Sequence, residues 1–472
     1  HNLMAARAWA VGAFCFLASG LSNIPTEKCL GQECTPIASS AARITPERCT
    51  VLENTQNAVY TIKIKIGNPQ KEFRVVADTG SNVLVVPGAN CAACKRAGKD
   101  LYDFSASKTA KLTTHASKIT YGSGTVQGPL IHDTVTAIGV ESLNQSMLVM
   151  EQEEIQSYSS FSFDGIMGMG MPVNAMGTKD SDPGEDRSFF AQAGVDAFTM
   201  CFGKGPRPDG VLKLGSKRNT SFMFENVIGE VHWGVKLGGV HVADNKGPID
   251  GICQGKKGCA VIVDSGTTLI MAPSRHLVRL YSSLCSFLPS CEASAGKNAE
   301  PSLRSDMFLT SLLSCPDEMD NLPDLKFSLS ENKVSLSKET YVMKAHTKEL
   351  AMNNFMGGLN HSINFAQLDK KETVCVPAFM PMRMRSRKFG PIWIFGMPLM
   401  REYTVMFNRN QGSTPAVGFS RTTKCTGCKA GAMVSAAGLV TKYQEEPTHL
   451  SPTYIRKPNL ILEEEKSEFV RL

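Results

Sequence analysis

Two short apolar runs, far apart in the chain, each end in a turn that carries an aspartate. The run Val75–Ala77 precedes the turn Asp78–Ser81, and the run Val261–Val263 precedes the turn Asp264–Thr267. Short runs of β-branched residues bounded by turn residues are typical of buried strands. The segment Tyr60–Gly67 alternates isoleucine with lysine, which predicts a strand with one buried face.

The aspartate at the end of each predicted strand is costly to bury unless other groups compensate its charge. The glycine two residues later permits a tight turn and a close approach of another backbone. Two such turns at half-chain separation indicate a duplicated half-molecule that brings the carboxylates of Asp78 and Asp264 together. The alternative is two unrelated turns, because Asp, Gly and Ser are common turn residues.

The composition is that of a globular protein with room for two or more domains. The chain has 472 residues, of which 42% are hydrophobic and 20% charged, and its 40 glycines suit a turn-rich β protein. The net charge of +6 is modest and spread along the chain, without a dense block of Lys and Arg. This charge pattern gives no support for binding to nucleic acid.

The segment 4–22 has the pattern of a secretory signal. Arg7 supplies the positive start, Ala8–Leu17 form the apolar part, and Ala18–Gly20 are small residues that suit cleavage. The apolar part is short for a membrane span, and so is the later apolar segment Ala430–Val440. We therefore expect no transmembrane anchor once the signal is removed.

The chain has fifteen cysteines, and setting aside Cys15 in the signal leaves an even number. In an oxidising compartment an even set indicates a disulfide framework, with free buried thiols as the alternative. Cys91 and Cys94 show the Cys-x-x-Cys spacing, which Cys425 and Cys428 repeat. This spacing also occurs in redox and zinc sites, but no histidine pair accompanies it here.

The turn sequences Asp-Thr-Gly-Ser and Asp-Ser-Gly-Thr resemble the paired signatures of pepsin-like aspartic proteases. Tyr121–Gly124 resembles the flap of that family, a hairpin that closes over bound peptide, with an ordinary hairpin turn as the alternative. Phe163–Gly168 and Trp393–Gly396 resemble the apolar-apolar-Gly elements that cross behind the two aspartate turns. The resemblance extends from about Tyr60 to Phe419.

The resemblance implies a mainly β, bilobal fold, with two lobes related by a pseudo-twofold axis and the active-site cleft between them. We expect a signal peptide at 1–22 and a short N-terminal or pro segment at 23–50. The N-terminal catalytic lobe is expected at 51–215, the C-terminal lobe at 216–420, and a partly disordered extension at 421–472. Pro segments of the family are usually basic, whereas the charges of residues 23–50 balance.

The resemblance also implies roles for individual residues. It implies Asp78 and Asp264 as catalytic residues, supported by Thr79, Gly80, Ser81, Ser265, Gly266 and Thr267. It implies substrate contacts from Tyr121, Gly122, Ser123, Phe163, Ile166 and Thr268. It implies the disulfides Cys91–Cys94, Cys253–Cys259 and Cys315–Cys375, while Cys285 and Cys291 would close an additional local loop.

One position departs from the family pattern. Where the family often has a tryptophan, seven residues after the first aspartate, this chain has Val85. The tryptophan holds the flap tyrosine by a hydrogen bond, and valine offers no donor. We therefore expect Tyr121 to have fewer fixed positions in the free enzyme.

We expect an aspartic endopeptidase in which one carboxylate activates a water and its protonated partner binds the scissile carbonyl. This reaction requires neither a metal nor another cofactor. The expected partners are polypeptide substrates with bulky apolar residues around the cleaved bond, bound by a monomer. The expected location is the secretory pathway, ending outside the cell or in an acidic vacuole or lysosome-like compartment.

Two other functions also fit part of the pattern. One is a non-catalytic protein of the same fold that binds peptides, and the other is a glycosidase that uses paired carboxylates. Proteins of the first kind usually lose part of one signature, whereas both signatures are complete here. The second is supported only by the presence of two acids. Complete signatures therefore favour the protease.

Overall fold

The computed structural model describes most of the chain from Arg48 to Thr422. The described residues are 48–55, 58–155, 158–171, 188–204, 209–242, 247–315, 317–346, 373–409, 414–422, 424–425, 428 and 468–469. They all belong to one compact unit, Thr45–Leu472. The predicted signal, most of the predicted pro segment, the apolar segment Ala430–Val440 and most of the predicted extension at 421–472 lie outside the described residues.

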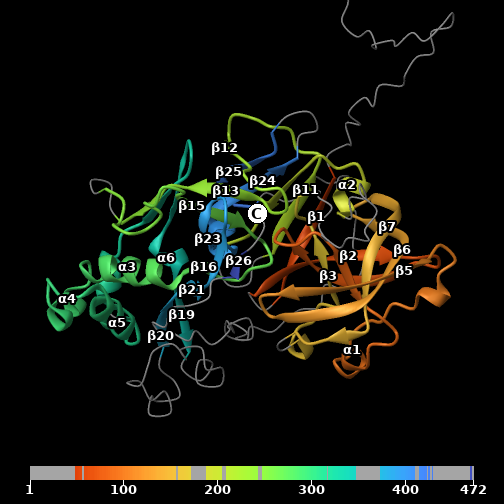
Figure 1. Cartoon of the computed structure of the whole chain (residues 1–472), viewed down its shortest axis with the longest axis horizontal. Coiled ribbons are helices and arrows are strands. Elements are labelled where there is room, and N and C mark those ends of the chain that lie inside the picture. The colour runs from red at the N-terminus through yellow and green to blue at the C-terminus, as the bar shows by residue number, and fades with distance from the viewer. Residues whose placement is uncertain are drawn as a thin grey trace, which may run out of the picture. The chain divides into compact units, whose positions relative to one another are not determined.

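The first part of the chain is built almost entirely of strands (Figure 1). The strands are β1 (Arg48–Thr55), β2 (Val59–Ile66), β3 (Lys71–Asp78), β4 (Leu84–Pro87), β5 (Lys111–Tyr121), β6 (Gly124–Ala137), β7 (Val140–Met150), β8 (Gln152–Glu153), β9 (Gly165–Gly168), β10 (Ala197–Cys201) and β11 (Gly210–Leu214). The helices are α1 (Ala92–Arg96) and α2 (Phe189–Gln192), with 3-10 turns at Phe104–Ala106 and Tyr158–Ser160.

The second part adds further strands and most of the helical residues. The strands are β12 (Met223–Asn226), β13 (Gly234–Leu237), β14 (Gly239–His241), β15 (Cys259–Val263), β16 (Ile270–Pro273), β17 (Leu325–Ser328), β18 (Lys333–Leu336), β19 (Val342–His346), β20 (Thr373–Pro377), β21 (Phe379–Met382), β22 (Met384–Ser386), β23 (Gly390–Phe395), β24 (Tyr403–Asn408), β25 (Ala416–Arg421) and β26 (Glu468–Phe469). The helices are α3 (Ser274–Cys285), α4 (Pro289–Ala295), α5 (Pro301–Leu312), α6 (Lys338–Tyr341) and α8 (Met397–Glu402), with a 3-10 turn at Asp317–Asn321.

The same five-strand arrangement occurs twice. In the first half the order is β2-β3-β9-β4-β7, and in the second it is β13-β15-β23-β16-β21. The strands that lead into the aspartates are β3 and β15. Each pairs antiparallel with an earlier strand, β2 or β13, and parallel with the strand that crosses behind the turn, β9 or β23. The crossing strand then pairs antiparallel with the strand that follows the aspartate turn. The predicted mainly β, bilobal, duplicated fold is confirmed.

One continuous sheet also joins strands from both halves of the chain. Its strand order is β12-β25-β24-β10-β11-β1. The two halves meet where β10 pairs with β24, with Ala197 opposite Asn408. The strand order then runs on from β1 to β2 and into the first five-strand arrangement. The lobe boundary between residues 215 and 216, and the boundary at 420, stay predictions.

The core follows the alternation that the sequence predicts. In β2, Ile62, Ile64 and Ile66 are at most 2% exposed, while Lys65 between them is exposed. The strands before the two aspartates are buried on both faces, as in parallel sheets that are covered on both sides. Trp233 and Trp393 are fully buried and anchor the core of the second half.

Three helices between the second aspartate turn and residue 312 were not predicted. α3 and α5 pack through a stacked contact of Tyr281 and Phe308, with ring centroids 5.5 Å apart. A disulfide between Cys285 and Cys291 ties the end of α3 to α4. Figure 1 shows the three helices gathered at one side of the second-half strands. Among the described residues, no helix is both long enough and apolar enough to cross a membrane.

All four expected cysteine pairs are bonded in the structure, and the described residues contain two further disulfides. The expected pairs are Cys91–Cys94, Cys253–Cys259, Cys285–Cys291 and Cys315–Cys375. The additional bonds are Cys201–Cys425 and Cys49–Cys428. A zinc site shared by Cys91, Cys94, Cys425 and Cys428 is therefore wrong, because each sulfur is already bonded. The start of the predicted extension is covalently attached to β1 and β10.

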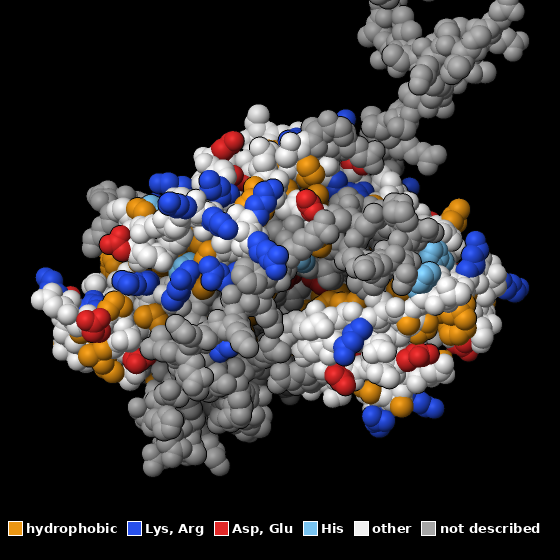
Figure 2. All heavy atoms as spheres, viewed as in Figure 1, with side chains coloured by type: hydrophobic (Ala, Val, Ile, Leu, Met, Phe, Trp, Pro, Cys, Tyr) orange, Lys and Arg blue, Asp and Glu red, His pale blue; other side chains and the backbone are white. Residues whose placement is uncertain are grey.

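The positive charge is less evenly distributed than the sequence suggested. Figure 2 shows Lys and Arg side chains gathered over the region of β13, β15 and β23, with few acidic side chains among them. Arg385, Arg387 and Lys388 lie on or beside the short β22–β23 hairpin. The Lys257 Nζ donates to the Arg387 carbonyl (2.6 Å), which joins the 253–259 loop to this hairpin. The expectation of a spread-out charge is therefore wrong for this face.

Candidate active site

The first signature turn closes around its own aspartate. The backbone N–H of Gly80 donates to Oδ1 of Asp78 (2.8 Å), and the Ser81 hydroxyl donates to Oδ2 (2.5 Å). Each carboxylate oxygen thus has a fixed donor from within the turn. These bonds fix the plane of the Asp78 carboxyl group at the end of β3.

The second turn repeats this arrangement at the end of β15. The backbone N–H of Gly266 donates to Oδ1 of Asp264 (2.8 Å), and the Thr267 hydroxyl donates to Oδ2 (2.6 Å). Serine in one turn and threonine in the other supply the same hydroxyl donor. The two carboxyl groups are therefore held by equivalent local bonds.

The two turns also hold each other through a symmetric set of hydrogen bonds. The Thr79 N–H donates to the Ser265 hydroxyl, and the Ser265 N–H donates to the Thr79 hydroxyl, both at 2.9 Å. Each hydroxyl then donates across to a strand of the other half: Thr79 to the Val263 carbonyl and Ser265 to the Ala77 carbonyl. All four groups are buried, so these bonds exchange little with water.

A second symmetric pair of bonds lies four residues after each aspartate. Asn82 Nδ2 donates to the Val231 carbonyl (3.1 Å), which precedes β13. The Thr268 hydroxyl donates to the Ala58 carbonyl (2.7 Å), which precedes β2. Thr268 was predicted to contact substrate, whereas in this structure its hydroxyl joins the two halves. Asn82 was not predicted at all.

The carboxyl groups of the two aspartates face one another. A Cβ atom at Gly80 would lie 2.5 Å from the Asp264 carboxyl carbon, and one at Gly266 would lie 2.4 Å from Oδ1 of Asp78. Only glycine leaves room for this approach. Burial, and then the charge of Asp264, raise the pKa of Asp78 above the usual carboxyl range, against the opposing hydrogen bonds from Ser81 and Gly80.

The predicted flap is the hairpin formed by β5 and β6. Tyr121 pairs with Gly124 at its tip, and Gly122 and Ser123 form the turn between them. A Cβ atom at Gly122 would meet nothing within 4 Å, whereas one at Gly124 would lie 2.2 Å from the Glu154 carbonyl oxygen, so one side of the tip is open and the other packs on the segment after β8. The structure thus places the three predicted flap residues at the turn of the β5–β6 hairpin, next to the pairing of β6 with β8.

The predicted pocket residues lie in one apolar cluster. Phe163 and Ile166 are buried there together with Val85, and Tyr121 packs against this cluster from the flap. Val85 pairs with Ile166 across β4 and β9. Sequence reasoning missed Lys99, whose Nζ donates to the Phe161 carbonyl and lies 4.4 Å from the Tyr158 ring centroid, behind this cluster.

Two residues that the sequence did not single out lie next to the second turn. The Trp233 indole N–H donates to the Met169 carbonyl (2.9 Å), which joins the two halves beside the aspartates. His232, the residue before it, interacts with Asp264 and with the backbone of Gly80. A lone histidine outside a motif gives no sequence signal for such a position.

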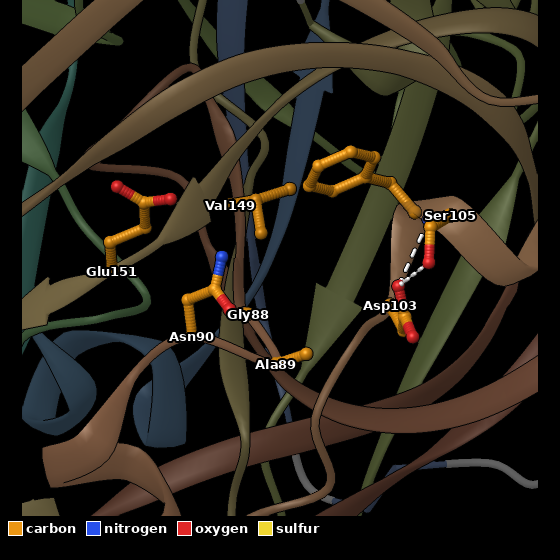
Figure 3. A pocket seen from close by; sticks show the side chains of 8 residues that line it. Gly88, Ala89, Asn90, Asp103, Ser105, Val149 and Glu151 are labelled. Carbon is orange, nitrogen blue, oxygen red and sulfur yellow. Dashed lines mark hydrogen bonds between the residues drawn. The ribbon is translucent and has the colours of Figure 1, made fainter.

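A cavity of about 230 Å³ lies elsewhere, beside the 3-10 turn that starts at Phe104 (Figure 3). Asn90, Asp103 and Glu151 are among the residues that line it, and neither signature aspartate is. Figure 3 shows Asp103 bonded to Ser105 on one side of the cavity and the Glu151 carboxylate on the other. The cavity is therefore separate from the aspartate pair.

One group of metal-type side chains lies close together among the described residues. Cys253, Cys259 and His276 bring their ligand atoms within 4.8 Å of one another. The two sulfurs are bonded to each other, and Nδ1 of His276 accepts a hydrogen bond from the Trp393 indole (3.1 Å). These atoms are thus already engaged in structural bonds.

A duplicated β fold with two facing aspartates, each in an Asp-hydroxyl-Gly turn, is the architecture of an aspartic protease. Residues 59–421 match the family model described as eukaryotic aspartyl protease, and the chain belongs to this family. It is 27% identical to cathepsin D of Gallus gallus over 80% of this chain and 84% of that protein. It is 26% identical to pepsin A of Sus scrofa over 76% and 80%, and 27% identical to renin of Echis ocellatus over the same shares. The chain is an aspartic endopeptidase, a hydrolase that acts on polypeptides.

Proposed function

We propose that Asp78 and Asp264 form the catalytic pair of this endopeptidase and share one proton. The supporting observation is the crossed set of hydrogen bonds between Thr79 and Ser265, which supports the two carboxyl groups facing each other at a buried site. Two carboxylates this close cannot both ionise at low cost, so one proton stays on the pair. The raised pKa of Asp78 agrees with this.

The pair performs hydrolysis with that single proton. The ionised carboxyl takes a proton from a water held between the two aspartates, and the water oxygen attacks the scissile carbonyl. The protonated carboxyl donates to the carbonyl oxygen, which stabilises the tetrahedral intermediate. A proton then passes from the pair to the amide nitrogen, the C–N bond breaks, and the pair returns to its starting state.

The substrate preference follows from two apolar surfaces near the pair. On the flap side, Tyr121 packs against the buried cluster that contains Phe163 and Ile166. On the other side, Ile262 lies two residues before Asp264, so both side chains share one face of the sheet. Ile262 pairs with Ile394 and packs with Met382 in a second apolar cluster. We infer a preference for bulky apolar residues on both sides of the cleaved bond.

The location and the domain scheme are proposals as well. Six disulfides among the described residues suit an oxidising compartment, in agreement with the signal pattern at 4–22. We place the enzyme in the secretory pathway and expect it to work as a monomer. The lobe boundary near residue 215 and the processing of residues 1–50 complete the scheme.

The test is cleavage of a quenched fluorescent peptide at acid pH by Asp78→Asn and Asp264→Asn variants. Each variant should lose roughly 10²–10⁴-fold in kcat or more, because general acid–base catalysis is lost. Near-ultraviolet circular dichroism should stay unchanged. Asp103→Asn, at an exposed acid beside the separate cavity, is the matched control and should keep full activity.

Near wild-type activity in either folded Asn variant would defeat the proposed pair. A wild-type chain that binds a statine-type transition-state mimic but cleaves no peptide would instead favour the non-catalytic binding protein.

A further inference from the structure

The segment 231–233 is fixed against both signature turns. The Val231 carbonyl accepts from Asn82 Nδ2 (3.1 Å), and the Trp233 carbonyl accepts from the Val263 N–H (3.1 Å). The Trp233 indole donates to the Met169 carbonyl. His232 lies between these two anchored residues, so its backbone position is set by contacts with both halves of the molecule.

The strand register places His232 opposite Asp264. β13 and β15 pair antiparallel with Gly234 opposite Ile262, and the Val263 N–H to Trp233 carbonyl bond continues the same register. One further step brings His232 opposite Asp264. Directly opposed residues in an antiparallel pair point to the same face, with Cβ atoms about 5 Å apart. The imidazole and the Asp264 carboxylate are therefore cross-strand neighbours.

The first half has a valine at the equivalent position. β2 and β3 pair with Thr61 opposite Val76, so the same step places Val59 opposite Asp78. Val59 is fully buried in the apolar cluster. A group that can carry a positive charge thus faces one aspartate and not the other.

The imidazole is half-buried, and its charge state depends on pH in the acid range. Burial lowers the pKa of His232, while the Asp264 carboxylate and the Gly80 backbone act in the opposite direction. The ring is therefore neutral near neutral pH and gains its proton as the solution becomes acid. Its Nδ1 is buried and has no hydrogen-bond partner among the described residues.

We infer that His232 is a positioning residue of the active site, which in its protonated form keeps the Asp264 carboxylate ionised and so extends peptide cleavage to lower pH. This inference rests on the proposed catalytic pair. As pH falls, the pair gains a second proton and loses its base. An imidazolium next to Asp264 opposes that step electrostatically, so activity persists further into acid. Towards neutral pH the ring loses its proton, so the effect weakens from the acid limb of the profile to the alkaline limb.

Among the described residues, the other charged groups near the His232 ring are acidic, so none of them can replace the positive charge of the imidazolium. Asp264 lies opposite it at the end of β15, and the Asp78 carboxyl group faces that of Asp264. Glu230 lies two residues earlier on the same segment and is exposed. A change at His232 should therefore act through the pair.

The test compares pH profiles of kcat/KM for wild type, His232→Gln and His232→Val, with the same fluorescent peptide. His232→Gln keeps an amide that can donate to Gly80, and His232→Val copies the residue opposite Asp78. Both variants should move the acid limb to higher pH by roughly one unit and move the alkaline limb by less. His241→Gln is the matched control, because His241 pairs with Ser328 on β14 (2.9 Å) and should leave both limbs unchanged.

A second readout follows the proton itself. The His232 ring resonance, assigned by its loss in His232→Gln, should titrate at lower pH in Asp264→Asn than in wild type, because the anion that favours imidazolium is gone. An unmoved acid limb in both folded His232 variants would overturn the inference, and so would an equal shift of both limbs. Full activity of Asp264→Asn would instead overturn the catalytic pair, so the two failures are distinguishable.

Discussion

The two halves of the molecule hold their aspartates with the same backbone but surround them with different side chains. Both use an Asp-hydroxyl-Gly-hydroxyl turn, a parallel crossing strand and a bond from the fourth residue after the aspartate to the other half. The first half adds the flap and an apolar valine, Val59, opposite its aspartate. The second half adds His232 and the helices α3, α4 and α5.

The features shared by both halves are the turns and hydrogen bonds that position the aspartates, whereas the side chains around the aspartates differ between the halves. The repeated bonds place the carboxyl groups, so a change in them should harm both halves alike. The side chains that differ between the halves act on substrate binding, on pH dependence or on stability. A change in one of them should therefore affect one half and leave the other as it is.

The largest effect is expected from Gly80→Ala and Gly266→Ala. Each added Cβ would lie about 2.5 Å or less from the opposing carboxyl group, so the two aspartates would be forced apart. A misplacement of this order costs about 10²-fold in activity. Both variants should lose kcat to a similar extent in the peptide assay. Gly255→Ala, where the added atom meets nothing within 4 Å, should behave as wild type.

A strong loss in one glycine variant alone would show that the two turns are not equivalent in the working enzyme.

The next largest effect concerns a buried carboxylate found only in the second half. Glu402 is 1% exposed and accepts hydrogen bonds from Ser337 (2.6 Å), Thr340 (2.5 Å) and Lys204 (2.9 Å). Burial alone would raise its pKa, but these bonds outweigh burial and lower the pKa of Glu402 to about 2. Its contribution to stability is present above the ordinary carboxyl pKa and is lost as pH falls towards about 2.

Glu402→Gln should therefore lower the free energy of unfolding by about 2–3 kcal/mol at neutral pH. The difference from wild type should shrink as pH falls from about 4.5 towards about 2. Denaturant unfolding at several pH values measures this. Glu339→Gln, at an exposed residue of α6, is the control. A pH-independent difference would mean that the charge of Glu402 is not what matters.

The smallest effect is expected at Val85, in the first half. Val85 is fully buried between β7 and β9, so a larger side chain should cost about 1–3 kcal/mol of stability. Val85→Trp adds bulk and an N–H donor near the flap tyrosine, while Val85→Phe adds bulk alone. If the missing donor loosens the flap, Val85→Trp should bind a statine-type mimic several-fold more tightly than Val85→Phe.

Equal affinities of the two Val85 variants, measured by calorimetry on folded protein, would remove the flap argument while leaving the catalytic pair untouched.

The sequence predicted the parts of the fold that short contiguous motifs specify. The two signature turns, the strands before them and the flap are contiguous motifs, and the family resemblance that they carry also implied a short disulfide loop such as Cys253–Cys259. Pairs such as Cys201–Cys425 join distant segments, and no local pattern specifies their partner. α3 was overlooked although Leu277, Leu280 and Leu284 have helical spacing on its buried face.

The sequence did not predict the roles of residues that depend on how distant strands align. His232 stands in no motif, and its position opposite Asp264 depends on how β13 aligns with β15. Glu402 is similar, because its partners Lys204 and Ser337 come from distant parts of the chain. A polar residue gains its role from such neighbours only after the tertiary fold has formed.

We propose that the Asp78 and Asp264 carboxyl groups share one proton during catalysis. The most direct measurement is kcat/KM of the wild-type enzyme on one peptide across the range from strongly acid to alkaline pH. A bell-shaped profile on the acid side of neutrality is expected, because activity needs one proton on the pair. Activity is lost when the pair gains a second proton or loses its last one. Maximal activity at alkaline pH would contradict the shared proton.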